Sequence, residues 1–236
     1  MSKYVLITGA AGGIGSAIAK KFIENGFKVV SIDLESADFG ENFISEIADV
    51  TDIKSLLKIK EKYNNIEFKH LITLAGRALE DEWKPFKEQP IESLKESIDL
   101  NLVGHLNTIR IFYGQIQKSI ITISSINAYG GFGLPVYSSG KAGLISFTRT
   151  VYKEFLKDGI RINTICPGTI VTDATLKEPK DFSELLKGTK NGRFATKQEV
   201  ADLAFELCEN SKESGEIKII DEGQLEYSRN HERRCS

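Results

Sequence analysis

Short apolar runs rich in valine and isoleucine alternate with longer amphipathic stretches along almost the whole chain. The runs lie at residues 3–7, 27–32, 44–48, 70–75, 119–124, 160–165 and 216–220. Strands that alternate with helices pair in parallel, because each crossover helix returns the chain to the same edge of the sheet. Such sheets are covered by helices on both faces. The alternation therefore predicts an α/β fold, with a doubly wound parallel sheet of about seven strands.

The pattern continues without a linker or a repeat, so we expect a single domain over residues 1–227. Long helical patterns run over about 91–117 and 137–157. Residues 173–194 contain Pro179, Gly188 and Gly192 and are predicted to form a mobile insertion that serves as a substrate lid. The polar residues 228–236 are expected to be a disordered tail.

Composition excludes several classes of partner. A net charge of −2 gives no long-range attraction to nucleic acid, and no apolar run is long enough to span a membrane. The cysteines are odd in number and widely spaced, which favours a reducing compartment, so we expect a cytoplasmic protein. No metal site is expected, because the three histidines are isolated from one another: His70, His105 and His231.

A glycine-rich turn, "LITGAAGGIG" at residues 6–15, joins the first strand to the first helix. At this place a Rossmann-like sheet presents backbone N–H groups and a positive helix end to a pyrophosphate. Asp33 ends the second strand, 18 residues beyond Gly15. A carboxylate there accepts hydrogen bonds from a ribose 2′-hydroxyl and repels a 2′-phosphate. Since no basic residue stands at positions 10, 11, 34 or 35, the sequence favours NAD over NADP.

Tyr137 and Lys141 lie four residues apart on the second long helical pattern. Such a pair is by itself an ordinary amphipathic feature, with Cβ atoms about 5–6 Å apart. A tyrosine, with a reference pKa of about 10, is a poor base near neutrality unless a nearby cation favours the phenolate. Together with the nucleotide turn, the pair predicts a general acid/base, Tyr137, whose pKa is lowered by Lys141.

In combination, Thr8-Gly9-x-x-x-Gly13-Ile14-Gly15, Asn101, Ser125 and Tyr137-x-x-x-Lys141 resemble the short-chain dehydrogenase/reductase family over nearly the whole chain. The resemblance implies a catalytic set in which Ser125 holds the substrate oxygen, Lys141 also binds the nicotinamide ribose, and Asn101 kinks its helix and keeps a water in the proton relay. It also implies the cofactor-binding residues, which are Gly9, Gly13, Ile14, Gly15, Asp33, Asp49, Val50, Ala75, Gly76, Tyr137, Lys141, Pro167, Ile170 and Thr172. Asp49 and Val50 would face the adenine, and Ile170 and Thr172 the nicotinamide carboxamide.

Three positions depart from the family pattern or leave it open. Adjacent strand side chains point to opposite faces, so only one of Ser124 and Ser125 can face the substrate; we choose Ser125, and Ser124 stays possible. The family's Asn-Asn-Ala-Gly is Thr73-Leu74-Ala75-Gly76 here, for which we expect altered stability more than lost activity. Glu222 stands where the family has a glycine, in a segment that often lies at a subunit interface in members of the family.

The sequence thus predicts an NAD-dependent oxidoreductase that interconverts a secondary alcohol and a ketone. A nucleotide-sugar epimerase or dehydratase is the first alternative, although only about 95 residues follow Lys141 to form a substrate domain. A non-catalytic NAD-binding regulator is the second. The substrate stays open among a carbohydrate, a polyol, a cyclic diol and an acyl ketone, in a pocket walled by residues 77–86, 126–134 and 173–194. The two long helices resemble the pair through which this family commonly forms dimers and tetramers, so the resemblance implies a homodimer or homotetramer.

Overall fold

The computed structural model describes residues 3–130 and 132–228. A seven-stranded, wholly parallel sheet forms the centre, in the order β3-β2-β1-β4-β5-β6-β7. The strands are β1 (Lys3–Thr8), β2 (Phe27–Asp33), β3 (Phe43–Ile47), β4 (Phe68–Thr73), β5 (Ile116–Ile123), β6 (Arg161–Pro167) and β7 (Ile217–Ile220). The predicted doubly wound α/β fold is confirmed. The predicted tail lies, apart from its first residue, outside the described residues.

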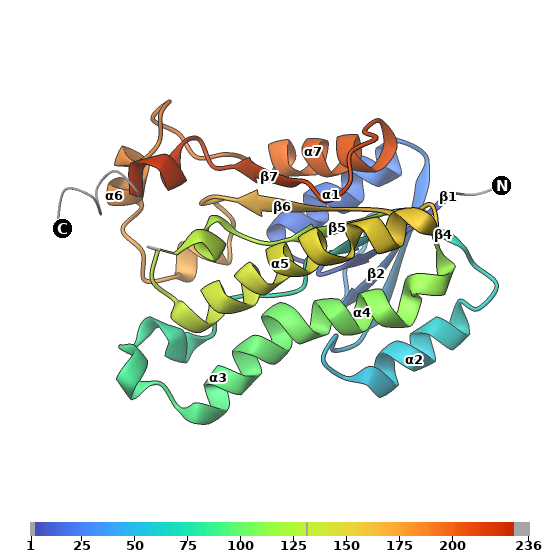
Figure 1. The fold of residues 1–236 in the computed structure, drawn as a ribbon, viewed down its shortest axis with the longest axis horizontal. Coiled ribbons are helices and arrows are strands. Elements are labelled where there is room, and N and C mark those ends of the chain that lie inside the picture. Colours follow the sequence, from blue (N-terminus) through green and yellow to red (C-terminus); the bar gives the residue numbers. More distant parts are fainter. Residues whose placement is uncertain (1–2, 131, 229–236) are drawn as a thin grey trace.

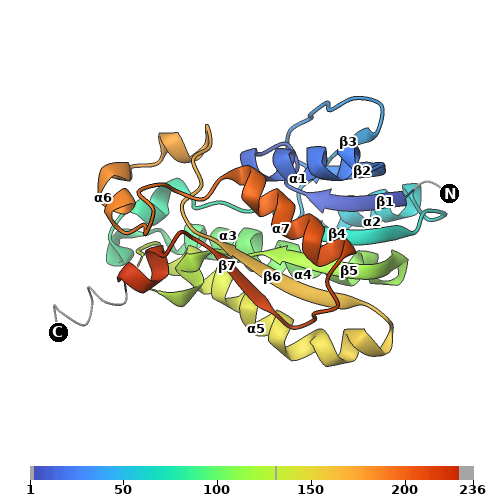
Figure 2. The same cartoon turned by 90° about the horizontal axis from the view of Figure 1, so that it is seen from above.

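Helices cover both faces of the sheet (Figure 1). They are α1 (Gly13–Glu24), α2 (Ile53–Lys62), α3 (Ile91–Ile98), α4 (Gly104–Phe112), α5 (Pro135–Lys157), α6 (Phe182–Lys187) and α7 (Lys197–Glu209). One core cluster lies under α1 and α7 and includes Phe22 and Leu207. The other lies under α2, α4 and α5 and includes Leu56, Phe112 and Phe155. Seen from above, α1 and α7 lie over one face, with α3, α4 and α5 behind the sheet (Figure 2).

The first long helix differs from its prediction over 91–117. A single π-helical turn, η3 (Asp99–Val103), separates α3 from α4, and α4 ends at Phe112. A short 3₁₀ turn, η4 (Tyr113–Gln115), contains Gly114 and leads directly into β5, which begins at Ile116 rather than at 119. Glycine is a poor helix former, and the apolar Ile116 pairs with Phe68 of β4, so the chain changes from helix to strand earlier than the pattern predicts.

Short 3₁₀ turns lie in the connections that follow β4, β5 and β6: η1 (Glu80–Trp83), η2 (Phe86–Glu88), η5 (Ile126–Tyr129) and η6 (Thr175–Lys177). These turns and α6 gather at the end of the molecule toward which the strands point (Figure 1). No helix among the described residues is long and apolar enough to cross a bilayer.

Candidate active site

The predicted site residues collect at the carboxyl edge of the sheet. β1 pairs with β2 on one side and with β4 on the other, so the chain winds outward in both directions from this point. In doubly wound sheets, ligands bind in the crevice where the winding direction reverses. The segments that follow β1, β2, β4, β5 and β6 all begin at this edge.

The glycine turn after β1 is packed too tightly for side chains. A Cβ on Gly15 would lie 2.0 Å from the Gly9 carbonyl oxygen, and Gly9 has a φ of 79°. A Cβ on Gly13 would lie 2.5 Å from Cγ2 of Thr172, which follows β6. The backbone of the turn is therefore not covered by side chains, and Gly13 lies against Thr172.

Asp33, the last residue of β2, faces this turn. Its Oδ2 accepts a hydrogen bond from the Ala11 amide at 2.9 Å, and its Oδ1 accepts one from the Leu34 amide at 2.7 Å. A third, longer hydrogen bond of 3.4 Å comes from the Glu35 amide to Oδ1. Three backbone donors thus fix the carboxylate beside the glycine turn, with the side chain only partly buried.

The segment after β4 is tied to β1 and lies against the catalytic candidates. The Thr8 hydroxyl accepts hydrogen bonds from the amides of Leu74 (3.1 Å) and Ala75 (3.3 Å). A Cβ on Gly76 would lie 2.6 Å from Asn101 Oδ1 and 3.2 Å from Lys141 Nζ. Gly76 therefore allows these two polar side chains to reach the backbone.

Asn101 lies within the π-helical turn η3 and is fully buried. Its Nδ2 donates to the Arg77 carbonyl at 2.9 Å and to the Ser97 carbonyl at 3.1 Å. Its Oδ1 has no hydrogen-bond partner among the described residues. The turn interrupts the helix at the residue where the resemblance implies a kink, and it leaves a buried acceptor facing Gly76.

Tyr137 lies in the first turn of α5, with Lys141 one turn further along. The Lys141 Nζ is 5.7 Å from the centre of the Tyr137 ring and donates to the Ile123 carbonyl at 3.1 Å. Ser125 forms a hydrogen bond with Tyr137, whereas the Ser124 hydroxyl donates to the Lys141 carbonyl at 2.8 Å. Of the two serines, Ser125 is thus the one beside the tyrosine.

Burial governs the titration of both groups. It raises the pKa of Tyr137 to about 12, against the opposing effect of the Ser125 hydrogen bond. It lowers the pKa of Lys141 to about 8. In the protein alone the net pKa of Tyr137 is therefore raised rather than lowered as expected, because the loss of hydration is the largest of its causes.

The remaining predicted cofactor residues lie along the same edge. Val50 is buried, and its Cγ2 would be 2.6 Å from a Cβ on Gly104, whereas Asp49 is exposed and accepts hydrogen bonds from Thr51. Pro167 ends β6. Ile170 is buried and forms a bridge with Ala195. Among residues 3–130 and 132–228, no group of three or more metal-binding side chains occurs.

Two buried groups near the site were missed by sequence reasoning. His105, read as isolated, is 2.9 Å from the Thr73 hydroxyl through Nδ1; burial and the Lys141 charge hold its pKa well below its usual range. The pair braces β4 against α4 where the family has asparagine at position 73. Glu82 is 2% exposed and accepts a hydrogen bond from the Tyr137 amide at 2.6 Å. Its place in the acidic run "EDE" gave no sign of burial.

The predicted lid touches the other pocket walls. The Lys180 Nζ lies 5.4 Å from the centre of the Trp83 ring, which joins the lid to the segment after β4. Glu222, the departure near the C-terminus, pairs with Arg193 at 2.8 Å and accepts a hydrogen bond from Asn191 at 2.6 Å. Its carboxylate thus ties the segment after β7 to the end of the lid.

Comparison with known proteins identifies relatives along the whole chain. A family model described as short chain dehydrogenase matches residues 3–182. Carbonyl reductase family member 4 of Xenopus laevis is 32% identical over 238 residues, which cover 94% of this chain and 98% of that protein. A 3-oxoacyl-(acyl-carrier-protein) reductase of Thermotoga maritima is 30% identical over 243 residues, covering 94% and 97%.

Solved structures share the fold. An oxidoreductase of the short chain dehydrogenase/reductase family from Burkholderia thailandensis superposes with a TM-score of 0.88 at 28% identity, covering 100% of this chain and 97% of that chain. A 3-oxoacyl-(acyl-carrier-protein) reductase from Brucella melitensis with bound NAD has a TM-score of 0.83 at 27% identity, covering 94% and 91%. The protein ElxO with NADP bound has a TM-score of 0.87 at 26% identity, covering 96% and 100%.

Proposed function

This chain belongs to the short-chain dehydrogenase/reductase family, and we propose that it is an NAD-dependent oxidoreductase that interconverts a secondary alcohol and a ketone, with Tyr137 as general acid/base. The observation that carries the proposal is the meeting of Tyr137, Ser125, Lys141 and Asn101 beside the bare glycine turn. A proton-transfer group and a dinucleotide cradle at one edge of a sheet are what a hydride-transfer reaction requires.

The glycine turn fits a dinucleotide. The N–H groups at the start of α1 and the absent Cβ atoms of Gly9, Gly13 and Gly15 leave a backbone surface for a pyrophosphate. Val50 and Asp49 are proposed to face the adenine, and Ile14, Ala75, Gly76, Pro167, Ile170 and Thr172 to line the rest of the cofactor site. When bound, the nicotinamide supplies the hydride acceptor or donor.

Asp33 supports NAD as the cofactor. Its carboxylate stands fixed at the end of β2, where it can accept hydrogen bonds from ribose hydroxyls and would repel a 2′-phosphate. Structural relatives have been solved with NAD and with NADP, so the choice rests on Asp33 and its surroundings.

The proposed chemistry uses the phenol, the serine and the lysine of this chain. In reduction, the Tyr137 O–H donates a proton to the carbonyl oxygen, which Ser125 holds by a second hydrogen bond; in oxidation the proton returns to Tyr137. The Lys141 ammonium stabilises the phenolate that forms, and it is also proposed to bind the nicotinamide ribose. The buried, unpartnered Asn101 Oδ1 can accept a hydrogen bond from a water in the proton relay.

A nicotinamide absorbance assay tests the proposal directly. Wild type and Tyr137→Phe would be run side by side on a panel of ketones and secondary alcohols, which includes carbohydrates, polyols, cyclic diols and acyl ketones. We expect turnover on one chemical group, lost in the variant, with NADH affinity unchanged by fluorescence titration. Equal turnover in both proteins would refute the role of Tyr137. NADH binding without turnover on any compound would favour the non-catalytic regulator instead.

A further inference from the structure

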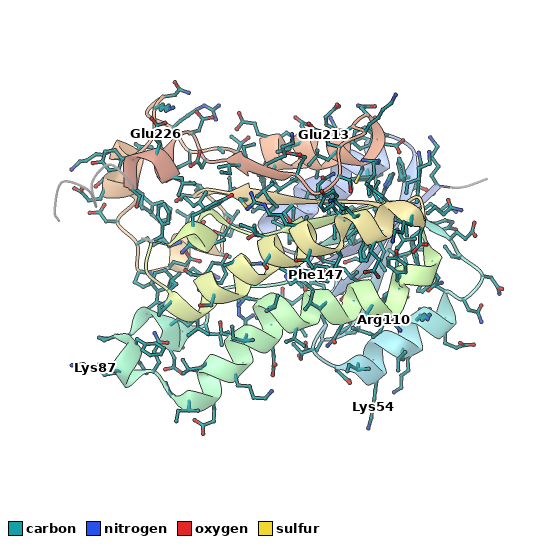
Figure 3. All side chains as sticks on the ribbon, in the orientation of Figure 1. Lys54, Lys87, Arg110, Phe147, Glu213 and Glu226 are labelled. Atoms are coloured by element: carbon teal, nitrogen blue, oxygen red, sulfur yellow. The ribbon has the colours of Figure 1, made fainter. Side chains whose placement is uncertain are left out.

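Glu82 is a buried carboxylate at the meeting point of three elements. It lies in η1, within the wall segment that we define as residues 77–86, and its side chain contacts both α3 and the start of α5. Its neighbours along the chain are different: Glu80 is exposed, and Lys87, just beyond the segment, points away from the body of the molecule (Figure 3). Burial of one acid in an acidic run requires partners, because an isolated buried charge is costly.

The partners of Glu82 use both carboxylate oxygens. Oε2 accepts from the Leu79 amide at 2.9 Å, which closes the wall segment on itself. Oε1 accepts from the Ser97 hydroxyl at 3.0 Å and from the Tyr137 amide at 2.6 Å. Ser97 in turn accepts from Asn101 Nδ2 through its carbonyl at 3.1 Å. One side chain thus links the pocket wall, the helix of Asn101 and the helix of Tyr137.

The start of α5 lacks any cap from its own sequence. Leu134 precedes the helix with a φ of 53° and provides no side-chain acceptor, and Pro135 has no N–H. The Ser138 amide bonds to the Leu134 carbonyl, which leaves the Tyr137 amide among the donors of the first turn that need an outside acceptor. Glu82 supplies it from a distant part of the chain, and its negative charge faces the positive end of α5.

We propose that Glu82 is a positioning residue that fixes the first turn of α5 to the pocket wall and places a negative charge beside the catalytic candidate Tyr137. The inference rests on the proposed role of Tyr137. A negative charge there opposes the phenolate, so Glu82 keeps Tyr137 protonated, in the form that donates the proton in carbonyl reduction. Other groups that face Tyr137 act alongside it: Glu178 from the lid and Cys166 from β6, which also raise the pKa of Tyr137, and Lys141 on the same helix.

The test compares Glu82→Gln with wild type and with Glu88→Gln, an exposed acid beyond the wall segment. Glutamine keeps the shape of glutamate, but its single oxygen cannot replace both carboxylate oxygens. In the pH profile of alcohol oxidation, we expect Glu82→Gln to lower the pKa assigned to Tyr137 by about half a unit, less than a charge in direct contact produces. The KM for the carbonyl substrate should rise, with an unchanged Kd for NADH. Glu88→Gln should behave like wild type.

Amide hydrogen exchange gives a readout that does not depend on turnover. In Glu82→Gln the Leu79 amide or the Tyr137 amide must lose its acceptor, so we expect faster exchange at one or both, with the rest of α5 unchanged. If Glu82→Gln does not fold, Ser97→Ala removes one bond to the same carboxylate and a long contact of 3.4 Å from Asn101 Nδ2, which keeps its shorter bonds to the Arg77 and Ser97 carbonyls. It should raise the same KM to a smaller extent.

Three outcomes decide the matter. A shifted profile with faster local exchange supports the proposal. A variant that is less stable but keeps the wild-type pH profile and KM overturns it, because Glu82 would then be only structural. If no substrate is turned over by wild type, the oxidoreductase proposal fails separately, and unchanged exchange at Leu79 and Tyr137 would still overturn the positioning role.

Discussion

At the amino edge of the sheet His70 lies between Ser119 and Glu209, whereas at the carboxyl edge Tyr137 lies beside Ser125 and Lys141. His70 Nδ1 is 2.7 Å from the Ser119 hydroxyl, and Nε2 is 2.9 Å from Glu209 Oε1. A neutral imidazole that accepts from Ser119 and donates to Glu209 satisfies both contacts. The carboxyl edge leaves the buried Asn101 Oδ1 unpaired instead.

This difference in hydrogen bonding distinguishes a cluster that stabilises the fold from a cluster that serves function. A serine, a histidine and an acid in a row resemble a hydrolase triad, but Ser119 and His70 are fully buried, so no substrate can reach them. Their hydrogen bonds join β4, β5 and α7 and can only stabilise the fold. At the carboxyl edge, by contrast, burial disfavours the charged form of Lys141. Active sites commonly contain such groups, which reduce the stability of the fold.

Lys141→Met should have the largest effect, because it should change turnover and stability in opposite directions. It removes the cation beside Tyr137, so we expect turnover to fall by roughly 10³-fold. Stability should rise at the same time. The Lys141 pKa falls from 10.5 in the unfolded chain to about 8 in the folded protein, so the unfolded state binds the proton better and the lysine destabilises the fold at neutral pH. The gain, about 1–2 kcal/mol after the lost hydrogen bond to Ile123, follows from this difference.

Urea unfolding at pH 7 and at pH 10 measures that gain, which should shrink as the pH rises from about 8 toward 10.5. Lys157→Met, an exposed lysine at the end of the same helix, is the matched control and should change neither quantity. A Lys141→Met protein less stable than wild type at pH 7 would contradict the argument.

His70→Leu should act in the opposite direction. It removes the ring partner of the buried Ser119 hydroxyl and one of the two partners of Glu209, which keeps Lys69 at 2.7 Å. We expect the free energy of unfolding to fall by about 2 kcal/mol. Because the cluster lies at the opposite edge from the site, kcat and KM at a permissive temperature should stay as in wild type. Thermal unfolding combined with steady-state kinetics checks both points. A variant with unchanged stability but altered kcat would contradict the purely stabilising role of His70.

Acid should reduce the stability of the protein through His70 at the amino edge. Burial lowers the pKa of His70 to about 4, despite the opposing contact with Glu209, whereas the unfolded chain titrates near 6.5. The unfolded state therefore binds more protons between these values, so the contribution is complete above pH 6.5 and is lost as the pH falls toward 4, by about 3 kcal/mol in all. Denaturation at pH 7, 5.5 and 4.5 should show this loss in wild type. The pH dependence should be weaker in His70→Leu, and equal slopes would disprove the assignment to His70.

The sequence predicted the carboxyl edge far better than the amino edge. The glycine turn, Asp33 and the Tyr137–Lys141 pair lie close together in the chain or follow strand ends, so spacing places them. His70, Ser119 and Glu209 come from three separate elements, and their meeting depends on the sheet register, in which His70 pairs with Ser119. The His105–Thr73 pair and the contacts of Glu82 were not predicted for the same reason, because they also join separate elements of the fold.

The lowered pKa expected for Tyr137 failed on a different ground. Helical spacing gives the distance between two charges but not the loss of hydration around them. That loss proved the larger effect at Tyr137.

Asp33→Ala should produce the smallest effect, a change in the preference for NADH over NADPH. It compares one acidic residue at the carboxyl edge, Asp33, with one at the amino edge, Glu209. Like Glu209, Asp33 is held by several hydrogen bonds, but all three of its donors are backbone amides. Its side chain stays partly exposed, so a ligand can still reach the carboxylate. Without the carboxylate, NADPH meets less repulsion and NADH loses its ribose contact, so the preference for NADH should narrow by roughly tenfold, or about 1.4 kcal/mol.

Asp33→Asn separates the two contributions to that preference. It keeps the shape of aspartate and one acceptor oxygen but removes the charge, so NADPH should gain affinity while NADH keeps part of its contact. Fluorescence titration of both cofactors with wild type and the two variants measures each affinity directly. If repulsion dominates, Asp33→Asn matches Asp33→Ala for NADPH; if the ribose contact dominates, only the alanine variant loses NADH affinity. An unchanged ratio in both would mean that another residue reads the ribose, and that Asp33, like Glu209, only supports the fold.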